Sequence, residues 1–155
     1  MIVIRPTDDY ATVKRLGVEA GLDESERDDD ESLAAWCAVD DETDEIVGGI
    51  TLELSRGMYT VNWMSVAAPW RRQGIAARLV QALEAEARRR GLTRLYLTAR
   101  IPGFYLDQGY VEVADPARRA LLLGGCPECP QYGVTCTPFA MVKELAGTVG
   151  EREGG

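Results

Sequence analysis

The sequence contains no histidine, and this absence excludes several classes of active site at once. Without an imidazole there is no Ser-His-Asp triad, no Cys-His dyad and no zinc site with a histidine ligand. Acid–base chemistry must then use carboxylates, tyrosine, lysine, cysteine or water. Basic residues are also in the minority, because 17 Lys and Arg stand against 25 Asp and Glu, for a formal net charge of -8. Nucleic acid is therefore not expected as a partner, since its phosphates are bound by basic surfaces.

Long apolar runs are missing as well. No segment reaches the roughly 18–20 apolar residues of a membrane span. Arg5 follows so soon after Met1 that the apolar stretch of a signal peptide is lacking, so a cytoplasmic protein is predicted. What is present is an ordinary globular composition, with 155 residues, 46% of them hydrophobic and 27% charged. We expect one domain over residues 1–147 and a frayed tail over 148–155.

Hydrophobic periodicity predicts strands before and after a central helix. A short strand at 2–4 and a helix at 10–18, ending near Gly17 or Gly21, precede an acidic run at 23–31 with seven acids and one base. The later expected elements are strands at 33–39, 46–54, 58–66, 95–98, 110–113 and 139–145, helices at 74–90 and 103–108, and an irregular segment at 121–136. Short polar turns make the three strands between 33 and 66 an antiparallel meander, and the helix between 58–66 and 95–98 makes those two strands parallel.

The junction between strand 58–66 and helix 74–90 carries the residues most suited to bind an anion. The free N–H groups at a helix N-terminus attract negative charge. Gly74 and Ala76 are small enough for a phosphate to approach the backbone, while Arg71 and Arg72 add positive charge. These residues predict a pyrophosphate site in an otherwise acidic protein. The alternative is a plain strand–helix turn with solvated arginines.

Two motifs in this region resemble those of the GNAT N-acetyltransferase superfamily. The spacing Arg71-x-x-Gly74-x-Ala76 is similar to the acyl-CoA loop of that family, usually written Arg/Gln-x-x-Gly-x-Gly/Ala. The segment 104–110, FYLDQGY, is similar to the family's Phe-Tyr-x-x-x-Gly-Phe segment. About 30 residues separate the two motifs, and the order of elements agrees over roughly residues 2–114.

This resemblance implies both a fold and an activity. The fold is α/β, a mixed and mostly antiparallel central sheet of six to seven strands with a β-α-β core that binds acyl-CoA, and about four helices. The enzyme uses acetyl-CoA as co-substrate and transfers its acetyl group to a primary amine by direct attack in a ternary complex. Strand 58–66 splays from strand 95–98, and the pantetheine arm lies in the wedge like an extra strand.

The resemblance also implies roles for individual residues. The expected backbone contacts to the pantetheine arm come from Met64, Ser65 and Val66, and the expected pyrophosphate loop consists of Arg71, Arg72, Gln73, Gly74, Ile75 and Ala76. Tyr105 corresponds to the general acid that protonates the departing thiolate, and its alternative is a packing aromatic. Glu53 is the candidate general base, and Asn62 is a candidate to hold a catalytic water. The alternative for both is a solvent-facing strand residue.

Three cysteines, Cys126, Cys129 and Cys136, stand close together in the segment 124–137. Zinc binding, a redox-labile pair and reduced structural thiols are all open, but a fourth ligand is missing nearby and no metal is expected. The same tail resembles that of short amino-acid N-acetyltransferases of the N-acetylglutamate synthase type, through Cys129-Pro130, Cys136 and Ala140-Met141. That resemblance favours a free amino acid as acceptor, whereas the acidic run at 23–31 favours a cationic amine.

The identity of the acceptor, a small-molecule or peptide amine, therefore stays open, as does the choice between a monomer and a homodimer. Two other functions remain as alternatives to a general N-acetyltransferase. One is a CoA-binding sensor without turnover, and the other is a small zinc-binding interaction module.

Overall fold

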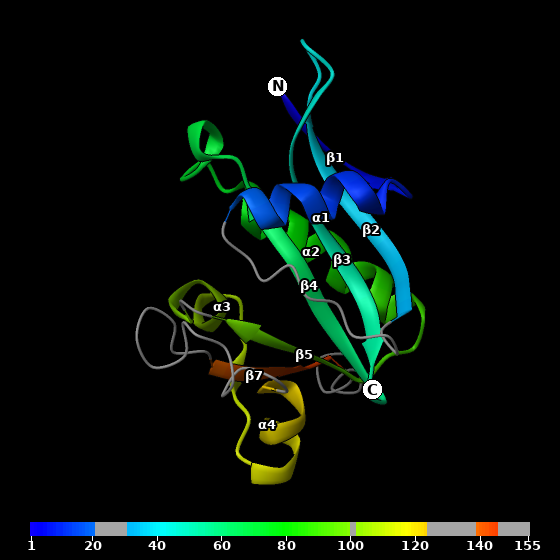
Figure 1. The fold of residues 1–155 in the computed structure, drawn as a ribbon, viewed down its shortest axis with the longest axis vertical. Helices are drawn as coiled ribbons and strands as arrows, with labels where there is room; N and C mark the ends of the chain where they lie inside the picture. The colour runs from blue at the N-terminus through cyan, green and yellow to red at the C-terminus, as the bar shows by residue number, and fades with distance from the viewer. Residues whose placement is uncertain (21–30, 100–101, 124–138, 146–155) are drawn as a thin grey trace, which may run out of the picture. The chain divides into compact units, whose positions relative to one another are not determined.

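The computed structural model describes residues 1–20, 31–99, 102–123 and 139–145. The chain divides into two compact units, residues 1–91 and residues 92–155 (Figure 1). Across the described residues, seven strands and four α-helices form a mixed α/β fold in which the strand pairings within each unit are antiparallel. This is the predicted fold class. The single domain over 1–147 and the parallel pairing of strands 58–66 and 95–98 stay predictions.

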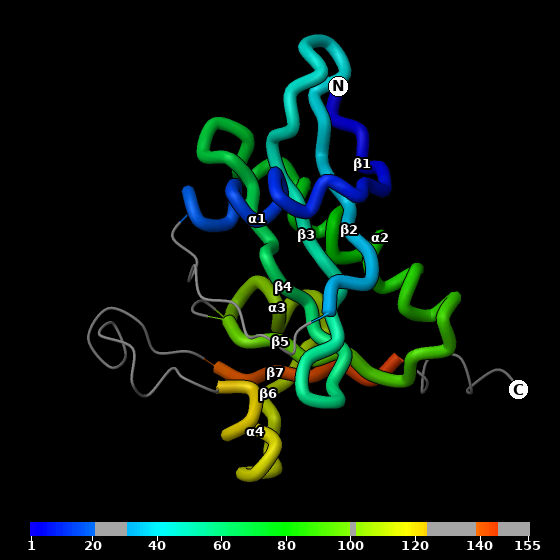
Figure 2. The backbone as a smooth tube through the Cα atoms, turned by 45° about the vertical axis from the view of Figure 1, so that its right-hand side comes forward, coloured from blue at the N-terminus to red at the C-terminus, as the bar shows by residue number. Residues whose placement is uncertain are grey.

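Among the residues that the structure describes, the first unit has four strands and two α-helices. The elements are β1 (Ile2–Thr7), α1 (Tyr10–Glu19), β2 (Glu31–Asp40), β3 (Glu45–Ser55), β4 (Met58–Val66), the 3₁₀ turn η1 (Ala68–Trp70) and α2 (Ile75–Arg89). Each strand pairs antiparallel with the next, so the predicted meander is confirmed. Figures 1 and 2 show α1 on one side of these strands and α2 on the other. The predicted helix at 74–90 corresponds to α2, and its apolar stripe, which includes Leu79, Leu83 and Ala87, is buried.

The capping and turn chemistry of the first unit follows from local sequence. Asp9 caps α1, because its carboxylate accepts hydrogen bonds from the Thr12 N–H at 3.2 Å and the Thr12 hydroxyl at 2.7 Å. Of the two predicted stops, the one near Gly21 is the better: the helix continues past Gly17, which is buried within it, and ends at Glu19 with Ala20 as its C-terminal cap. The roughly 1 kcal/mol that a helical glycine costs is therefore outweighed by packing. Arg56 and Gly57 have φ of 53° and 79°, as a tight two-residue hairpin turn requires.

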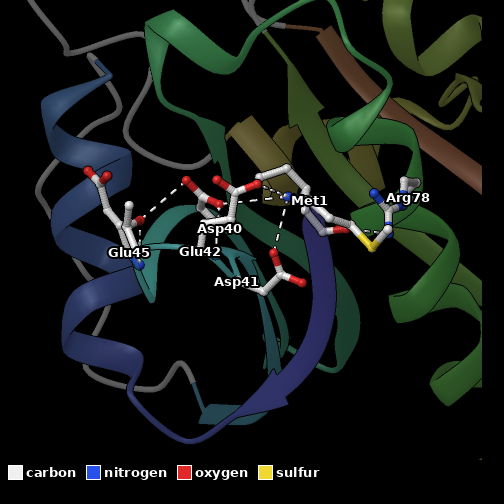
Figure 3. A network of polar contacts seen from close by, with 8 residues as sticks. Met1, Asp40, Asp41, Glu42, Glu45 and Arg78 are labelled. Carbon is white, nitrogen blue, oxygen red and sulfur yellow. Dashed lines mark hydrogen bonds and ion pairs between the residues drawn. The ribbon is translucent and has the colours of Figure 1, made fainter.

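The N-terminal strand is held by charged groups at its start. The Met1 ammonium lies 3.1 Å from the Asp41 carboxylate and 3.6 Å from that of Glu42, on the β2–β3 hairpin (Figure 3). These acids raise the pKa of the Met1 amine, mainly through the contact with Asp41. From α2, the Arg78 guanidinium donates a hydrogen bond to the Ile2 carbonyl at 3.1 Å. Strand β1 is also longer than predicted and passes through Pro6, which is tolerated because β1 is an edge strand.

In the second unit, the described ranges contain three strands and two helices. They are β5 (Arg94–Ala99), α3 (Gly103–Asp107), β6 (Val111–Glu112), α4 (Pro116–Leu123) and β7 (Phe139–Glu144). Strand β7 pairs antiparallel with both β5 and β6, which confirms the predicted closing strand. The irregular segment predicted from residue 121 is wrong for residues 121–123, which form the last turn of α4. Pro116 at the first helical position and the Asp115 carboxylate, which accepts a hydrogen bond from the Arg118 N–H at 3.3 Å, are the start signals that the prediction missed.

Gly49 on β3 allows α1 to pack closely on the sheet. A Cβ atom at this position would lie 2.9 Å from Cγ1 of Val13. We expect Gly49→Ala to lower the free energy of unfolding by roughly 1–3 kcal/mol, since the buried Val13 must move. Urea denaturation measures this. Gly103→Ala is the control, because a Cβ there meets nothing within 4 Å. A Gly49→Ala variant as stable as the parent would contradict the close contact.

Candidate active site

A buried carboxylate lies on β3, between the neighbouring strands β2 and β4. Glu53 on β3 is only 3% exposed, so the solvent-facing alternative is wrong for this residue. Its Oε1 accepts a hydrogen bond from the Asn62 amide at 2.7 Å, and its Oε2 accepts from the hydroxyls of Thr51 at 3.1 Å and Ser32 at 3.3 Å. These contacts hold both carboxylate oxygens of Glu53 in place.

The register of the sheet explains why these side chains meet. Residues directly opposite one another on paired strands point to the same face. Ser32 lies opposite Glu53, Glu53 lies opposite Thr60, and Thr51 lies opposite Asn62. Asn62 also donates to the Thr60 hydroxyl at 3.0 Å. We use the name Glu53 cluster for these five residues, which are Ser32, Thr51, Glu53, Thr60 and Asn62. The structure thus brings the two predicted residues Glu53 and Asn62 into direct contact.

A β-bulge interrupts β4 immediately after Asn62. The pairing shifts from Thr51–Asn62 to Gly49–Ser65, so that Trp63 and Met64 stand opposite one residue of β3. Trp63 has a φ of 57°, which is unusual for a residue inside a strand. The pair Gly48-Gly49 on the partner strand accompanies the bulge, and a glycine inside a strand often marks a bulge or a close backbone approach. The extra residue places Asn62 and Ser65 on the same face of the sheet.

The 71–76 loop begins where β4 and η1 end. Arg71 is turned back toward the strand, and its Nε donates a hydrogen bond to the Val66 carbonyl at 2.8 Å. Arg72 has a φ of 65° and is exposed, as are Gln73 and Gly74. A positive φ at a residue other than glycine is strained, and such strain is concentrated at functional sites. Arg71 therefore fixes the loop to β4, while Arg72 presents its charge to solvent.

The start of α2 satisfies the requirements of a phosphate site. The first hydrogen bond of the helix runs from the Arg78 N–H to the Gly74 carbonyl at 3.2 Å, so the N–H groups of residues 75–77 precede the helical ladder. Gly74 has a φ of 80°, and a Cβ built on it meets nothing within 4 Å. The space at the Cβ position of Gly74 is therefore open, beside the helix N–H donors and two residues after the exposed Arg72. These residues fit the pyrophosphate of CoA.

Tyr105 lies on α3 in the second unit, within an aromatic cluster. Its ring meets those of Phe104 and Tyr110 edge to face, with centroid separations of 5.0 and 5.7 Å. Tyr110 is 1% exposed and is a core residue. Burial raises the pKa of the Tyr105 hydroxyl above its ordinary value. The phenol is therefore protonated at neutral pH and has a proton to donate.

The structure gives no support for a metal site within the residues it describes. Among them, no three His, Cys, Asp or Glu side chains are placed to hold a metal ion. Cys126, Cys129 and Cys136 lie outside the described ranges. Cys37 on β2 is a buried free thiol, and burial raises its pKa, which makes it a weak ligand and nucleophile. None of the helices in the described part of the chain is long and apolar enough to cross a membrane.

Comparison with known families identifies the class of protein. Residues 5–110 match the sequence model of the Acetyltransferase (GNAT) family. This span is most of the chain and includes β4, the 71–76 loop, α2 and Tyr105. The chain belongs to the GNAT family and is an N-acyltransferase that depends on acetyl-CoA.

Solved structures share the fold over nearly the whole chain. A GNAT-family acetyltransferase from Staphylococcus aureus is 15% identical, with a TM-score of 0.61, and covers 94% of this chain and 99% of its own. Rv2747 from Mycobacterium tuberculosis, solved in complex with CoA, is 18% identical, with a TM-score of 0.65 and coverage of 92% and 99%. N-acetylglutamate synthase from Neisseria gonorrhoeae, solved with CoA and N-acetyl-glutamate, is 14% identical, with a TM-score of 0.63 and coverage of 94% of this chain and 35% of its own.

Proposed function

We propose that the protein transfers the acetyl group of acetyl-CoA to a primary amine by direct attack in a ternary complex. The observation that carries this proposal is the open, positively charged junction at the start of α2, in a chain of the GNAT family. Acetyl-CoA supplies the acetyl group as a thioester. The loop residues Arg71, Arg72, Gln73, Gly74, Ile75 and Ala76 hold the pyrophosphate, and the backbone of Met64, Ser65 and Val66 holds the pantetheine arm. A backbone N–H near Val66 stabilises the negative charge that develops on the thioester oxygen.

Glu53 acts as the general base in this proposal. The acceptor amine is protonated at neutral pH and must lose a proton before its nitrogen lone pair can attack. Glu53 takes that proton, directly or through one water. The amide of Asn62 and the hydroxyls of Thr51 and Ser32 hold the carboxylate in one orientation.

Tyr105 acts as the general acid. When the carbon–sulfur bond breaks, the thiolate carries away the electron pair and takes the phenolic proton. A protonated thiol is a poor nucleophile, so the reverse attack on the new amide is suppressed. The Tyr105 phenol holds its proton at neutral pH and can donate it to the thiolate, although burial, which raises its pKa, makes it a weaker acid than a free tyrosine.

An acceptor screen that detects the free CoA thiol tests the proposed activity. The purified protein is incubated with acetyl-CoA and panels of amino acids, polyamines, amino sugars and peptides with free N-termini. We expect release of thiol above the rate of spontaneous hydrolysis with at least one amine, and an acetylated amine of matching yield by mass spectrometry. Binding of CoA without turnover on any acceptor would instead favour the sensor.

A free amino acid is the second candidate acceptor class. The fold shared with N-acetylglutamate synthase from Neisseria gonorrhoeae supports it, as does the resemblance of Cys129-Pro130, Cys136 and Ala140-Met141 to the tails of short enzymes of that type. Ala140 and Met141 are buried on β7. Within the screen, turnover of L-glutamate in preference to polyamines would select this candidate, and the reverse preference would exclude it.

Replacement of Glu53 by glutamine tests the general base. Glu53→Gln keeps the shape, and the hydroxyls of Thr51 and Ser32 can rotate to accept from the new amide, so the fold is preserved. We expect kcat to fall roughly 10²-fold, because the basic carboxylate is lost, with KM for acetyl-CoA unchanged. The control is Glu45→Gln, an exposed carboxylate at the start of the same strand. Parental kcat in Glu53→Gln would exclude Glu53 as the base.

A further inference from the structure

Lys143 on β7 makes two contacts with the segment that carries Tyr105. Its Nζ donates a hydrogen bond to the Gln108 carbonyl at 2.8 Å. The same ammonium lies 5.7 Å from the centroid of the Tyr110 ring. Gln108 is the C-terminal cap of α3, and Tyr110 follows directly after the turn. Lys143 therefore joins the end of this short helix to the closing strand.

The local backbone is built around this lysine. The last carbonyls of a helix have no partner within it, and a cation there is favourable. Gly109 has a φ of 95°, and a Cβ at this position would lie only 3.3 Å from Cε of Lys143. Glycine thus serves both the left-handed turn and the passage of the lysine side chain. The turn is completed by the Tyr110 N–H, which donates to the Tyr105 carbonyl at 2.9 Å.

Two contact paths lead from Lys143 to Tyr105. The first runs through the helix end, because the Gln108 N–H donates to the Tyr105 carbonyl at 3.0 Å while the Gln108 carbonyl accepts from Lys143. The second runs through the Tyr110 ring, which lies beneath the ammonium and meets the Tyr105 ring edge to face. The first path fixes the backbone of Tyr105, and the second fixes the plane of its ring.

We propose that Lys143 is a positioning residue for the general acid. It anchors the C-terminal end of α3 to β7 and thereby fixes the direction in which the Tyr105 hydroxyl presents its proton. The inference rests on the proposed function of Tyr105 as the acid. Lys143 acts through Tyr105 and needs no contact with either substrate.

Substitution of Lys143 by methionine removes the ammonium and keeps the apolar stem. We expect kcat to fall about tenfold, the effect of one charge-assisted hydrogen bond, with KM for acetyl-CoA unchanged. Lys143→Arg keeps a donor and a cation and should recover most of the loss. Arg118→Met is the matched control, because Arg118 lies over the Tyr96 ring at 5.4 Å in the same unit and its loss should leave kcat unchanged.

A double-mutant cycle separates positioning from other effects. If Lys143 acts through Tyr105, Lys143→Met has no further effect on kcat when added to Tyr105→Phe. An equal loss in both backgrounds, or parental kcat in Lys143→Met, overturns the proposal. A parental kcat in Tyr105→Phe alone is a different result. It would show that Tyr105 is not the general acid.

A spectroscopic readout does not depend on turnover. In protein labelled with 3-fluorotyrosine, the Tyr105 ¹⁹F resonance is identified by its loss in Tyr105→Phe. We expect Lys143→Met to shift this resonance and Arg118→Met to leave it in place. An unmoved Tyr105 resonance in folded Lys143→Met overturns the positioning role. If the methionine variant does not fold, Lys143→Gln replaces it in every arm.

Discussion

Gly74→Glu should yield a folded protein that no longer binds CoA. A Cβ at Gly74 meets nothing within 4 Å, so the new side chain causes no internal clash. The left-handed backbone, with a φ of 80°, costs a residue other than glycine roughly 1–2 kcal/mol, which a typical domain tolerates. The carboxylate then fills the space proposed for the pyrophosphate and repels it. Titration calorimetry with CoA measures the loss, and circular dichroism checks the fold.

Gly57→Glu is the matched control for this experiment. Gly57 has nearly the same φ, 79°, and a Cβ there also meets nothing within 4 Å. It lies in the hairpin turn before β4, whereas the 71–76 loop follows the other end of that strand. The two variants therefore share the strain and the added charge but differ in place. Parental CoA affinity in folded Gly74→Glu would remove the 71–76 loop as the pyrophosphate site.

Tyr105→Phe should lower kcat by roughly 10²–10⁴-fold, the usual contribution of a positioned general acid. Water can partly replace the phenol, which places the loss toward the lower end of that range. The ring stays, so its packing against Phe104 and Tyr110 is preserved and KM for acetyl-CoA should not change. Steady-state kinetics with a fast acceptor, under conditions where chemistry limits the rate, measure the effect.

Tyr59→Phe controls for the loss of a hydroxyl elsewhere. Tyr59 lies near the start of β4, opposite Leu54, and its replacement should leave kcat at the parental value. If Tyr105→Phe also turns over at the parental rate, Tyr105 is a packing aromatic. The proton for the leaving thiolate would then come from water or from another side chain.

Elements specified by neighbouring residues could be predicted from sequence. Strand β4 and the two hairpin turns around β3 are placed as expected, because apolar periodicity and turn residues act over a few positions. The 71–76 loop could be predicted for the same reason, because its arginines, its glycine and the start of α2 are neighbours in the sequence. Helix α4 was missed because the Gly, Pro and Cys content of the following residues outweighed the start signal at Asp115 and Pro116.

Features that depend on pairing between distant residues could not be predicted. The burial of Glu53 follows from the register that brings Ser32, Thr51 and Asn62 around it. The pairing of β3 with β4 around Glu53 continues from the hairpin turn at Arg56 and Gly57, whereas the pairing of Ser32 with Glu53 lies beyond a register shift between Ser32 and Ala34. The contact between Lys143 and Gln108 joins residues 35 positions apart. For such features the sequence supplied the right residue types but not their partners.

Strand β1 lies at an edge of the sheet, and the groups along this edge have a consequence for assembly. A free strand edge can template the addition of a strand from another molecule, provided that it offers a regular row of donors and acceptors. Along β1, Pro6 has no N–H, and the Ile2 carbonyl already accepts a hydrogen bond from Arg78. An incoming strand would have to displace that guanidinium and would still find a gap at the proline. Sheet extension through β1, the common route to fibrils and to continuous-sheet dimers, is therefore disfavoured.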